Sequence, residues 1–149
     1  MEIRVPDGSE IDDRHTAYGA GLSPPITFVD VPEEAVTLAV FIEHVTDPDR
    51  SRVHWVIWNI PAGTDLPEGI PSTENPEMVP GAVQGNNTFS VLGYTPPQKY
   101  PDQVQTYRIT AYALDTRLSL SAGDEAEQVR DAMKHGVVAK ATRELGFSP

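Results

Sequence analysis

Two histidines and an aspartate, His44, His54 and Asp47, lie near one another in the sequence and are the side chains best suited to chemistry. An imidazole beside an anion is stabilised in its charged form and donates a short, charge-assisted hydrogen bond. Imidazoles and a carboxylate are also common metal ligands. On residue types alone, these side chains are compatible with an anion site, with a metal-dependent or hydrolytic enzyme of unknown substrate, and with strand histidines that only hydrogen-bond to their neighbours.

The rest of the sequence favours binding over catalysis. There is no cysteine, so a thiolate nucleophile, a thiolate metal site and a disulfide are excluded. The GxSxG elbow, the HExxH motif and a glycine-rich phosphate loop are also missing, and no serine–histidine–acid triad is indicated. We therefore expect a protein that is not an enzyme and needs no metal or other cofactor.

The other two histidines give weaker signals. His15 lies in an N-terminal turn and is expected on the surface. His135 follows a lysine in the C-terminal region and is expected to be an exposed helix residue.

Short segments rich in β-branched and aromatic residues must position these side chains. The main ones run from Thr37 to Ile42, from Val53 to Ile60 and from Thr106 to Ala113, and each has the length and composition of a strand. The first is apolar on both faces, which predicts the middle of a sheet. The third alternates, which predicts one buried and one partly wet face. Shorter strand candidates run from Glu2 to Val5, from Ile26 to Phe28 and from Thr88 to Leu92.

Two proline-rich stretches, from Pro61 to Gln84 and from Thr95 to Gln103, read as surface loops. Long loops of this kind are usually functional or disordered. A helical pattern occurs only from Asp124 to Leu145, where apolar residues recur at spacings of three and four. Gly136 is expected to divide this helix into two pieces.

The charge and hydropathy of the chain limit its partners. The 22 acidic residues outnumber the 11 basic ones, for a net charge of -11. This excess disfavours nucleic acid and stable association with an anionic membrane. A halophilic source and an ordinary acidic protein both explain it. No apolar run is long enough for a membrane span, and the charged N-terminus lacks an export signal, so a cytoplasmic location is expected.

Several motifs occur in an order that is shared by a known family. They are Ser23-Pro24-Pro25-Ile26, Val31-Pro32-Glu33, His54-Trp55 through Asn59-Ile60-Pro61-Ala62, Leu66-Pro67-Glu68-Gly69, the set Gly85, Asn87, Phe89, Gly93 and Tyr94, and Tyr112-Ala113-Leu114-Asp115. In order and spacing they resemble the phosphatidylethanolamine-binding, or Raf-kinase-inhibitor-like, family, in its bacterial and archaeal branch. The resemblance covers most of residues 9 to 145.

The resemblance implies a mainly β fold within a single domain spanning residues 1–149. A large central antiparallel sheet would pack with a smaller sheet, and one or two helices would lie near the C-terminus. Members of the family have a surface pocket that takes phosphate, acetate or phospholipid headgroups, and some regulate a kinase or a protease. For this chain it implies a small-anion or phospho-ligand-binding protein, with a regulated protein partner and a homodimer as further expectations. A channel for acyl chains is not indicated.

Four residues match the ligand pocket of the family. His54 matches its best-defined histidine and Tyr107 its tyrosine. Pro96 and Pro97 match the end of its proline-rich loop, but the glycine that precedes them is replaced by Thr95.

Two departures change the expected pocket. A second family histidine falls on Gln105, which keeps a neutral donor and loses a titratable charge. The family's pocket aspartate falls on His44 in an ungapped alignment, whereas a gapped alignment uses Asp47-Pro48-Asp49. We favour the ungapped alignment, because an odd shift would turn the faces of the strand over. On that alignment the pocket is more cationic than usual, especially below pH of about 6.5.

Overall fold

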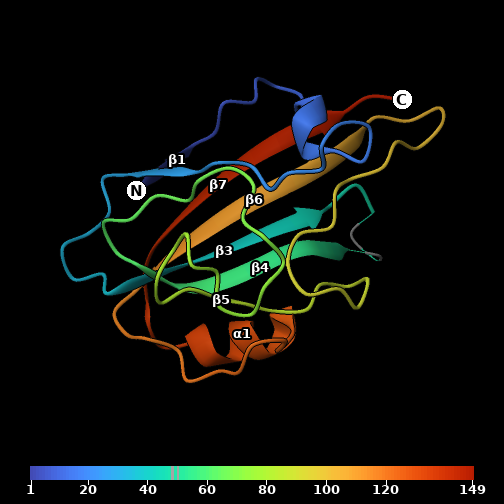
Figure 1. Ribbon diagram of the computed structural model, residues 1–149. Helices are drawn as coiled ribbons and strands as arrows, with labels where there is room; N and C mark the ends of the chain where they lie inside the picture. The colour runs from blue at the N-terminus through green and yellow to red at the C-terminus, as the bar shows by residue number, and fades with distance from the viewer. Residues whose placement is uncertain (48, 50) are drawn as a thin grey trace.

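The computed structural model describes residues 1–47, 49 and 51–149, and its centre is a five-stranded antiparallel sheet (Figure 1). The strands follow the order β5-β4-β3-β6-β7 across this sheet. Their bounds are Thr37–His44 for β3, Arg52–Pro61 for β4, Val83–Gln84 for β5, Gln105–Leu114 for β6 and Val137–Phe147 for β7. The three main predicted strands are therefore confirmed as β3, β4 and β6.

Strand β3 lies in the middle of the sheet, as its apolar sequence predicts, and all of its residues except Glu43 are buried. Its side chains enter two cores, because alternate residues point to opposite faces. Val40 and Ile42 belong to one core, and Ala39 and Phe41 to the other.

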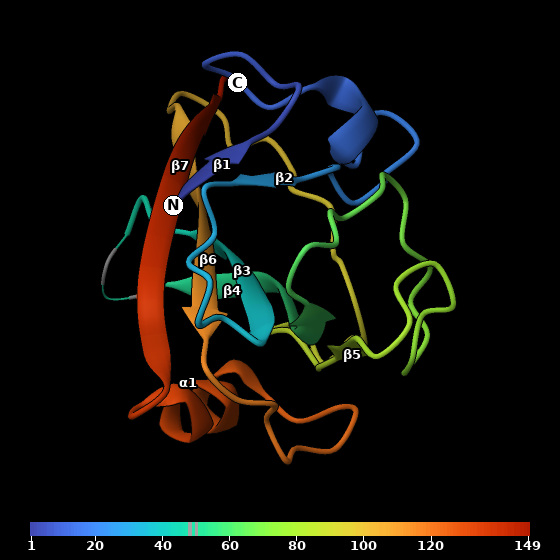
Figure 2. The same cartoon turned by 90° about the vertical axis from the view of Figure 1, so that its left-hand side faces the viewer.

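Different elements cover the two faces of the sheet (Figure 2). Strands β1, Glu2–Arg4, and β2, Thr27–Val29, pair as a small antiparallel sheet on the face of Val40. Helix α1, Ala126–Met133, buries Val129 and Met133 against Phe41 on the other face. A short 3-10 turn, η1, spans Asp13–His15, between β1 and β2 in the chain. The expected architecture, a large sheet with a smaller one and a helix late in the chain, is confirmed.

The predicted helix from Asp124 to Leu145 is wrong in its second half. Helix α1 ends before Gly136, and the chain continues as the edge strand β7 beside β6. Apolar residues four apart, such as Val137, Ala141 and Leu145, share one face of a helix and equally one face of a strand. Pairing decides between the two, since β7 satisfies the backbone groups along the whole edge of β6.

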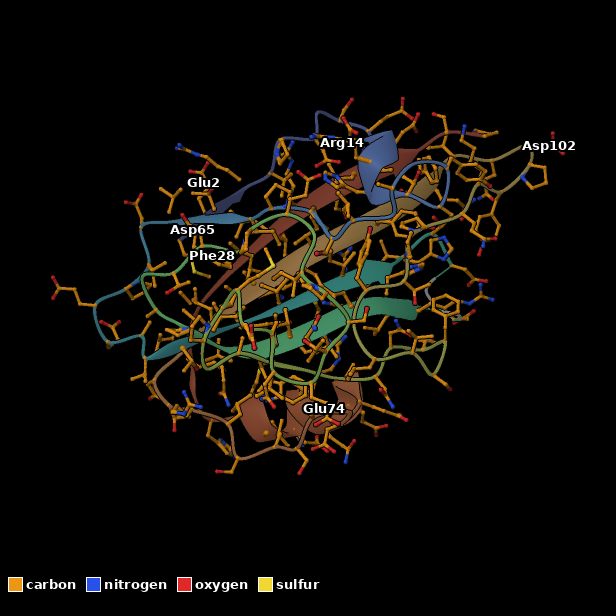
Figure 3. The ribbon with its side chains drawn as sticks, viewed as in Figure 1. Glu2, Arg14, Phe28, Asp65, Glu74 and Asp102 are labelled. Atoms are coloured by element: carbon orange, nitrogen blue, oxygen red, sulfur yellow. The ribbon has the colours of Figure 1, made fainter. Side chains whose placement is uncertain are left out.

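The predicted strand from Thr88 to Leu92 is also wrong. This segment turns around Asn87, whose side-chain oxygen accepts hydrogen bonds from the amides of Phe89 and Val91 at 2.9 and 3.3 Å. The predicted loop from Pro61 to Gln84 is confirmed except for β5 at its end. This loop is tied to the small sheet, because Asp65 accepts a 3.0 Å hydrogen bond from the amide of Phe28; both residues are labelled in Figure 3.

Candidate functional site

The predicted site residues come together where three strands begin or end. Because β3 runs antiparallel to both β4 and β6, the end of β3 lies beside the starts of the other two strands. His44, the last residue of β3, is opposite Arg52 on β4 and Tyr107 on β6. This end of the sheet lies on the right-hand side of Figure 1, where β3 ends and β4 and β6 begin.

A β-bulge in β4 determines the position of His54. Ile42 pairs with Trp55 and Glu43 with Val53, so His54 is the extra residue between these pairs. The bulge interrupts the alternation of the strand. Trp55 and Tyr107 share one core, and the His54 ring also contacts Tyr107, with ring centroids 5.2 Å apart. The bulge thus turns His54 toward the strand that carries the predicted tyrosine.

The segment from Asn87 to Thr95 is held against His54 by polar contacts. The amide of Thr95 donates to the carbonyl of His54 at 2.9 Å, and Nδ1 of His54 donates to the carbonyl of Thr95 at 2.7 Å. The amide group of Asn87 donates to Oγ1 of Thr95 at 2.7 Å and to the carbonyl of Gly93 at 3.0 Å. These bonds fix both the loop and the ring.

Burial favours the neutral form of the His54 ring, so this histidine does not supply the positive charge that the sequence predicts for it. Burial lowers the pKa of His54 to about 4; the charges of His44 and Arg52 act in the same direction, and the bond to Thr95 opposes them. Nδ1 carries the ring proton, because a carbonyl oxygen only accepts. Nε2 is then a hydrogen-bond acceptor, and no partner for it is found among the described residues.

His44 lies between two tyrosine rings and a glutamine. Its Nε2 donates to Oε1 of Gln105 at 2.6 Å, and its ring centroid is 5.4 Å from that of Tyr100 and 5.0 Å from that of Tyr107. The amide nitrogen of Gln105 donates to the carbonyl of Gln103 at 3.4 Å, which keeps the oxygen of Gln105 toward His44. Burial raises the pKa of Tyr107, so its hydroxyl remains a donor.

Two adjoining cavities open at this end of the sheet, and both are lined by Arg52 and Tyr100. The His44 cavity measures about 360 Å³ and is also lined by His44, Thr46, Asp47, Gln103 and Gln105. The His54 cavity measures about 390 Å³ and is also lined by His54, Phe89, Thr95, Pro96, Gln98, Lys99 and Tyr107.

All of the predicted site residues line one of these cavities except Pro97. Pro97 is buried, and its carbonyl accepts a 3.0 Å hydrogen bond from the amide of Ala17, so it anchors the N-terminal segment. The two candidates for the pocket aspartate position, His44 and Asp47, line the same cavity. Pro48, part of the gapped alignment, lies outside the described residues.

Arg52 and Tyr100 are site residues that the sequence did not reveal. Nη1 of Arg52 donates to the hydroxyl of Tyr100 at 2.9 Å, and the pair separates the two cavities. Arg52 reaches the site through its register opposite His44. Tyr100 comes from an irregular loop, for which periodicity gives no signal.

The metal alternative has no geometric support. Within the part of the chain that the structure describes, no three histidine, aspartate or glutamate side chains are arranged to hold a metal ion. His44, His54 and Asp47 are all described, and they do not form such a group.

A separate polar cluster surrounds His15, which is fully buried and not on the surface as expected. Its Nδ1 is 3.0 Å from Oδ2 of Asp7, and its Nε2 is 3.3 Å from Oε1 of Glu68. The second contact is electrostatic, because its geometry leaves both atoms without a hydrogen bond. The hydroxyl of Tyr94 donates to the carbonyl of His15 at 2.6 Å. His135 is exposed, as expected, but it lies in the turn after α1 and not in a helix.

Among the described residues, no helix is both long enough and apolar enough to cross a membrane.

Comparison with known proteins extends the resemblance over nearly the whole chain. The family model described as phosphatidylethanolamine-binding protein matches residues 2–148. A UPF0098 protein of Methanothermobacter thermautotrophicus is 38% identical over 136 residues, which cover 91% of this chain and 88% of the relative. The uncharacterized protein YxkA of Bacillus subtilis is 36% identical, with 97% and 98% covered.

Solved structures match equally well. The crystal structure of a phosphatidylethanolamine-binding protein homolog from Chlamydia trachomatis superposes with a TM-score of 0.85 at 31% identity, covering 99% of this chain and 97% of the other. E. coli YbcL, described as a member of the mammalian family, superposes with a TM-score of 0.87 over 99% and 98% of the two chains. Its identity is 23%, so it shows the shared fold.

Proposed function

Because this chain belongs to the phosphatidylethanolamine-binding protein family, we propose that it binds a small anion or phospho-ligand at the end of its central sheet. Phosphate, acetate and a phospholipid headgroup are the candidate ligands. The observation that carries the proposal is the convergence of Arg52 and Tyr107 on the His54 cavity. Guanidinium and phenol groups both donate hydrogen bonds to anionic oxygens.

The role we propose is binding and not catalysis. His54 donates its only ring proton to a main-chain carbonyl and not to a carboxylate. A histidine base in a nucleophilic mechanism needs an acidic group that orients it and a nucleophile within hydrogen-bond reach. The hydrogen bonds of the described residues give His54 neither of these partners.

We propose that the ligand-binding protein regulates a protein partner, such as a kinase or a protease. Exposed apolar side chains lie in the loops around the cavities, among them Phe89, Val91 and Val104. Apolar and aromatic residues beside a pocket are typical of binding surfaces. A homodimer would use the same kind of surface. We propose a cytoplasmic protein with no nucleic-acid ligand and no stable membrane association, in keeping with its net charge of -11.

Phosphate titration followed by NMR chemical shifts, at pH of about 6, tests the proposal. We expect shifts at His54, Tyr107 and Arg52, and a loss of affinity in His54→Ala. His135→Ala is the matched control, because His135 is exposed and outside both cavities. Undiminished affinity in a folded His54→Ala protein would contradict the proposal. Vesicles containing phosphatidylethanolamine, tested in parallel, separate a headgroup ligand from free phosphate.

A further inference from the structure

Arg52 occupies the boundary between the two cavities with most of its hydrogen-bonding capacity unused. A guanidinium has five N–H donors, and the bond from Nη1 to the hydroxyl of Tyr100 is the one found among the described residues. No ion pair between Arg52 and a described carboxylate is present. Its side chain is half-buried, so its charge is less screened than a surface charge.

Two basic side chains among the described residues line the His54 cavity, and of these Arg52 is the one available to a ligand. The ammonium group of Lys99 lies over the rings of Tyr18 and Phe147, 5.2 and 5.7 Å from their centroids. None of the described residues that line the His54 cavity is a carboxylate, whereas Asp47 lines the His44 cavity. An anion is therefore favoured on the His54 side of Arg52.

The His54 cavity is larger and more apolar than a bare inorganic anion requires. Its volume of about 390 Å³ falls in the range of pockets for small organic ligands. The rings of Phe89, Pro96 and Tyr107 form much of its wall. Phe89 lies edge-on to His54, with centroids 4.9 Å apart, and is 41% exposed, so a ligand could cover it further.

Nε2 of His54 completes this arrangement. Because Nδ1 donates to Thr95, Nε2 accepts a hydrogen bond from a hydroxyl group of the ligand or from a bridging water. The cavity thus offers a cation at one side, a neutral acceptor beside it and an apolar wall.

We propose that the ligand is an anion with an attached apolar group, that its charged oxygens pair with Arg52, and that its apolar part packs on Phe89 in the His54 cavity. This inference rests on the proposed function and makes Arg52 the residue that determines charge specificity. Tyr100 is a positioning residue, because it acts through the guanidinium.

Inorganic phosphate and phenyl phosphate, titrated calorimetrically into the full chain, test this inference. We expect phenyl phosphate to bind about tenfold or more tightly than phosphate, because its ring covers apolar surface. Arg52→Gln should weaken both ligands about tenfold or more. Phe89→Ala should remove the advantage of phenyl phosphate and leave phosphate affinity unchanged.

Two further variants make the result decisive. Arg108→Gln is the matched control, because Arg108 is an exposed arginine paired with Glu144. The Arg108→Gln protein should bind both ligands with wild-type affinity. Arg52→Lys keeps the charge but loses the planar fork, and should fall between the wild type and Arg52→Gln. Wild-type affinity in folded Arg52→Gln, or equal affinity for the two ligands, overturns this inference alone. If the wild type binds neither ligand, the proposed function fails with it.

Discussion

Nε2 of His44 and Oε1 of Gln105 lie 2.6 Å apart, joining the end of β3 to the start of β6. At these positions the family resemblance leads one to expect an aspartate and a histidine. In this chain an imidazole and an amide stand at these positions, and one hydrogen bond between them joins the two strands. The hydrogen bond assigns the ring proton to Nε2 of His44, because the amide oxygen can only accept.

We predict that Gln105→Leu destabilises the fold. The substitution leaves the buried N–H of His44 without its acceptor, which lowers the free energy of unfolding by roughly 1–3 kcal/mol. Urea denaturation measures this difference. Gln103→Leu is the control, because the side chain of Gln103 is exposed, and equal stability of the two variants would contradict the prediction.

A second prediction concerns acid stability and His54. The pKa of His54 is about 4 in the folded protein, whereas a histidine in the unfolded chain has a pKa of about 6.5. Between these values the unfolded chain binds more protons, so stability falls as pH falls from about 6.5 to about 4. The full effect is about 3 kcal/mol.

Urea unfolding of the wild type and of His54→Asn, at about pH 7 and about pH 4.5, isolates this effect from that of the carboxylates. The wild type should lose more stability than the variant between the two conditions. Parallel losses in both proteins would show that His54 does not titrate as its burial requires.

A strand is easier to predict from the sequence when both of its faces are buried than when only its pairing with a distant strand distinguishes it from a helix. The segment Thr37–His44 is apolar throughout, so its central place in the sheet follows from composition. The segment Val137–Phe147 carries apolar residues four apart, a spacing that fits a helix and a strand equally. Only the unpaired edge of β6, distant in sequence, resolves this ambiguity.

The candidate site was predictable to the extent that motifs carry it. His54 and Tyr107 follow from motif matches, and both line the His54 cavity. Arg52 enters through the register of two strands and a bulge, which depend on the folded sheet. His15 was expected on the surface because a turn is usually exposed, whereas its carboxylate partners, Asp7 and Glu68, come from distant segments.

A third prediction concerns alkaline stability and the cluster of Asp7, His15 and Glu68. Burial acts to lower the pKa of His15, but the hydrogen bond and charge of Asp7, together with the charge of Glu68, raise it above its ordinary value. The stabilisation is therefore complete below a pH of about 6.5 and is lost as pH rises through the folded pKa. The pH dependence of stability that comes from His15 is therefore opposite in sign to the one that comes from His54.

Asp7→Asn should remove most of this pH dependence and lower the free energy of unfolding by roughly 3 kcal/mol, because it leaves the charged partner of a buried pair uncompensated. Thermal unfolding measured between about pH 6 and pH 9 follows both effects. Asp13→Asn serves as the control, since Asp13 is exposed. If Asp7→Asn lost as much stability as the wild type between these pH values, the loss would have to come from another titratable group.

A fourth prediction concerns Gly85, which lies beside α1 and the core of β4. A Cβ at this position would overlap the main-chain oxygen of Asp124 and lie 2.8 Å from side-chain carbons of Trp58 and Val56. Because backbone and buried core must both move, Gly85→Ala should destabilise the protein by roughly 3 kcal/mol. Gly8→Ala is the control, since nothing lies within 4 Å of a Cβ at Gly8. Similar urea midpoints for the two variants would contradict the prediction, because they would mean that the core rearranges around the added methyl group at little cost.

A final prediction tests whether Arg52 or a histidine supplies the positive charge that binds the ligand. Arg52 remains protonated throughout the physiological range, and the neutral His54 adds no charge there. Among the described residues, the other titratable groups that line the two cavities are His44, Asp47, Lys99, Tyr100 and Tyr107. Benzenesulfonate is a suitable probe, because its own charge does not change with pH.

We expect the affinity for benzenesulfonate to be constant within about twofold between about pH 6 and pH 8. A site that depended on a charged histidine would lose affinity about tenfold for each pH unit above the pKa of that histidine. Calorimetric titration at several pH values gives the slope directly. A steep decline would identify His44 as the charge partner, because His44 lies opposite Arg52 at the same strand ends and is the histidine whose ring is not held by a main-chain carbonyl.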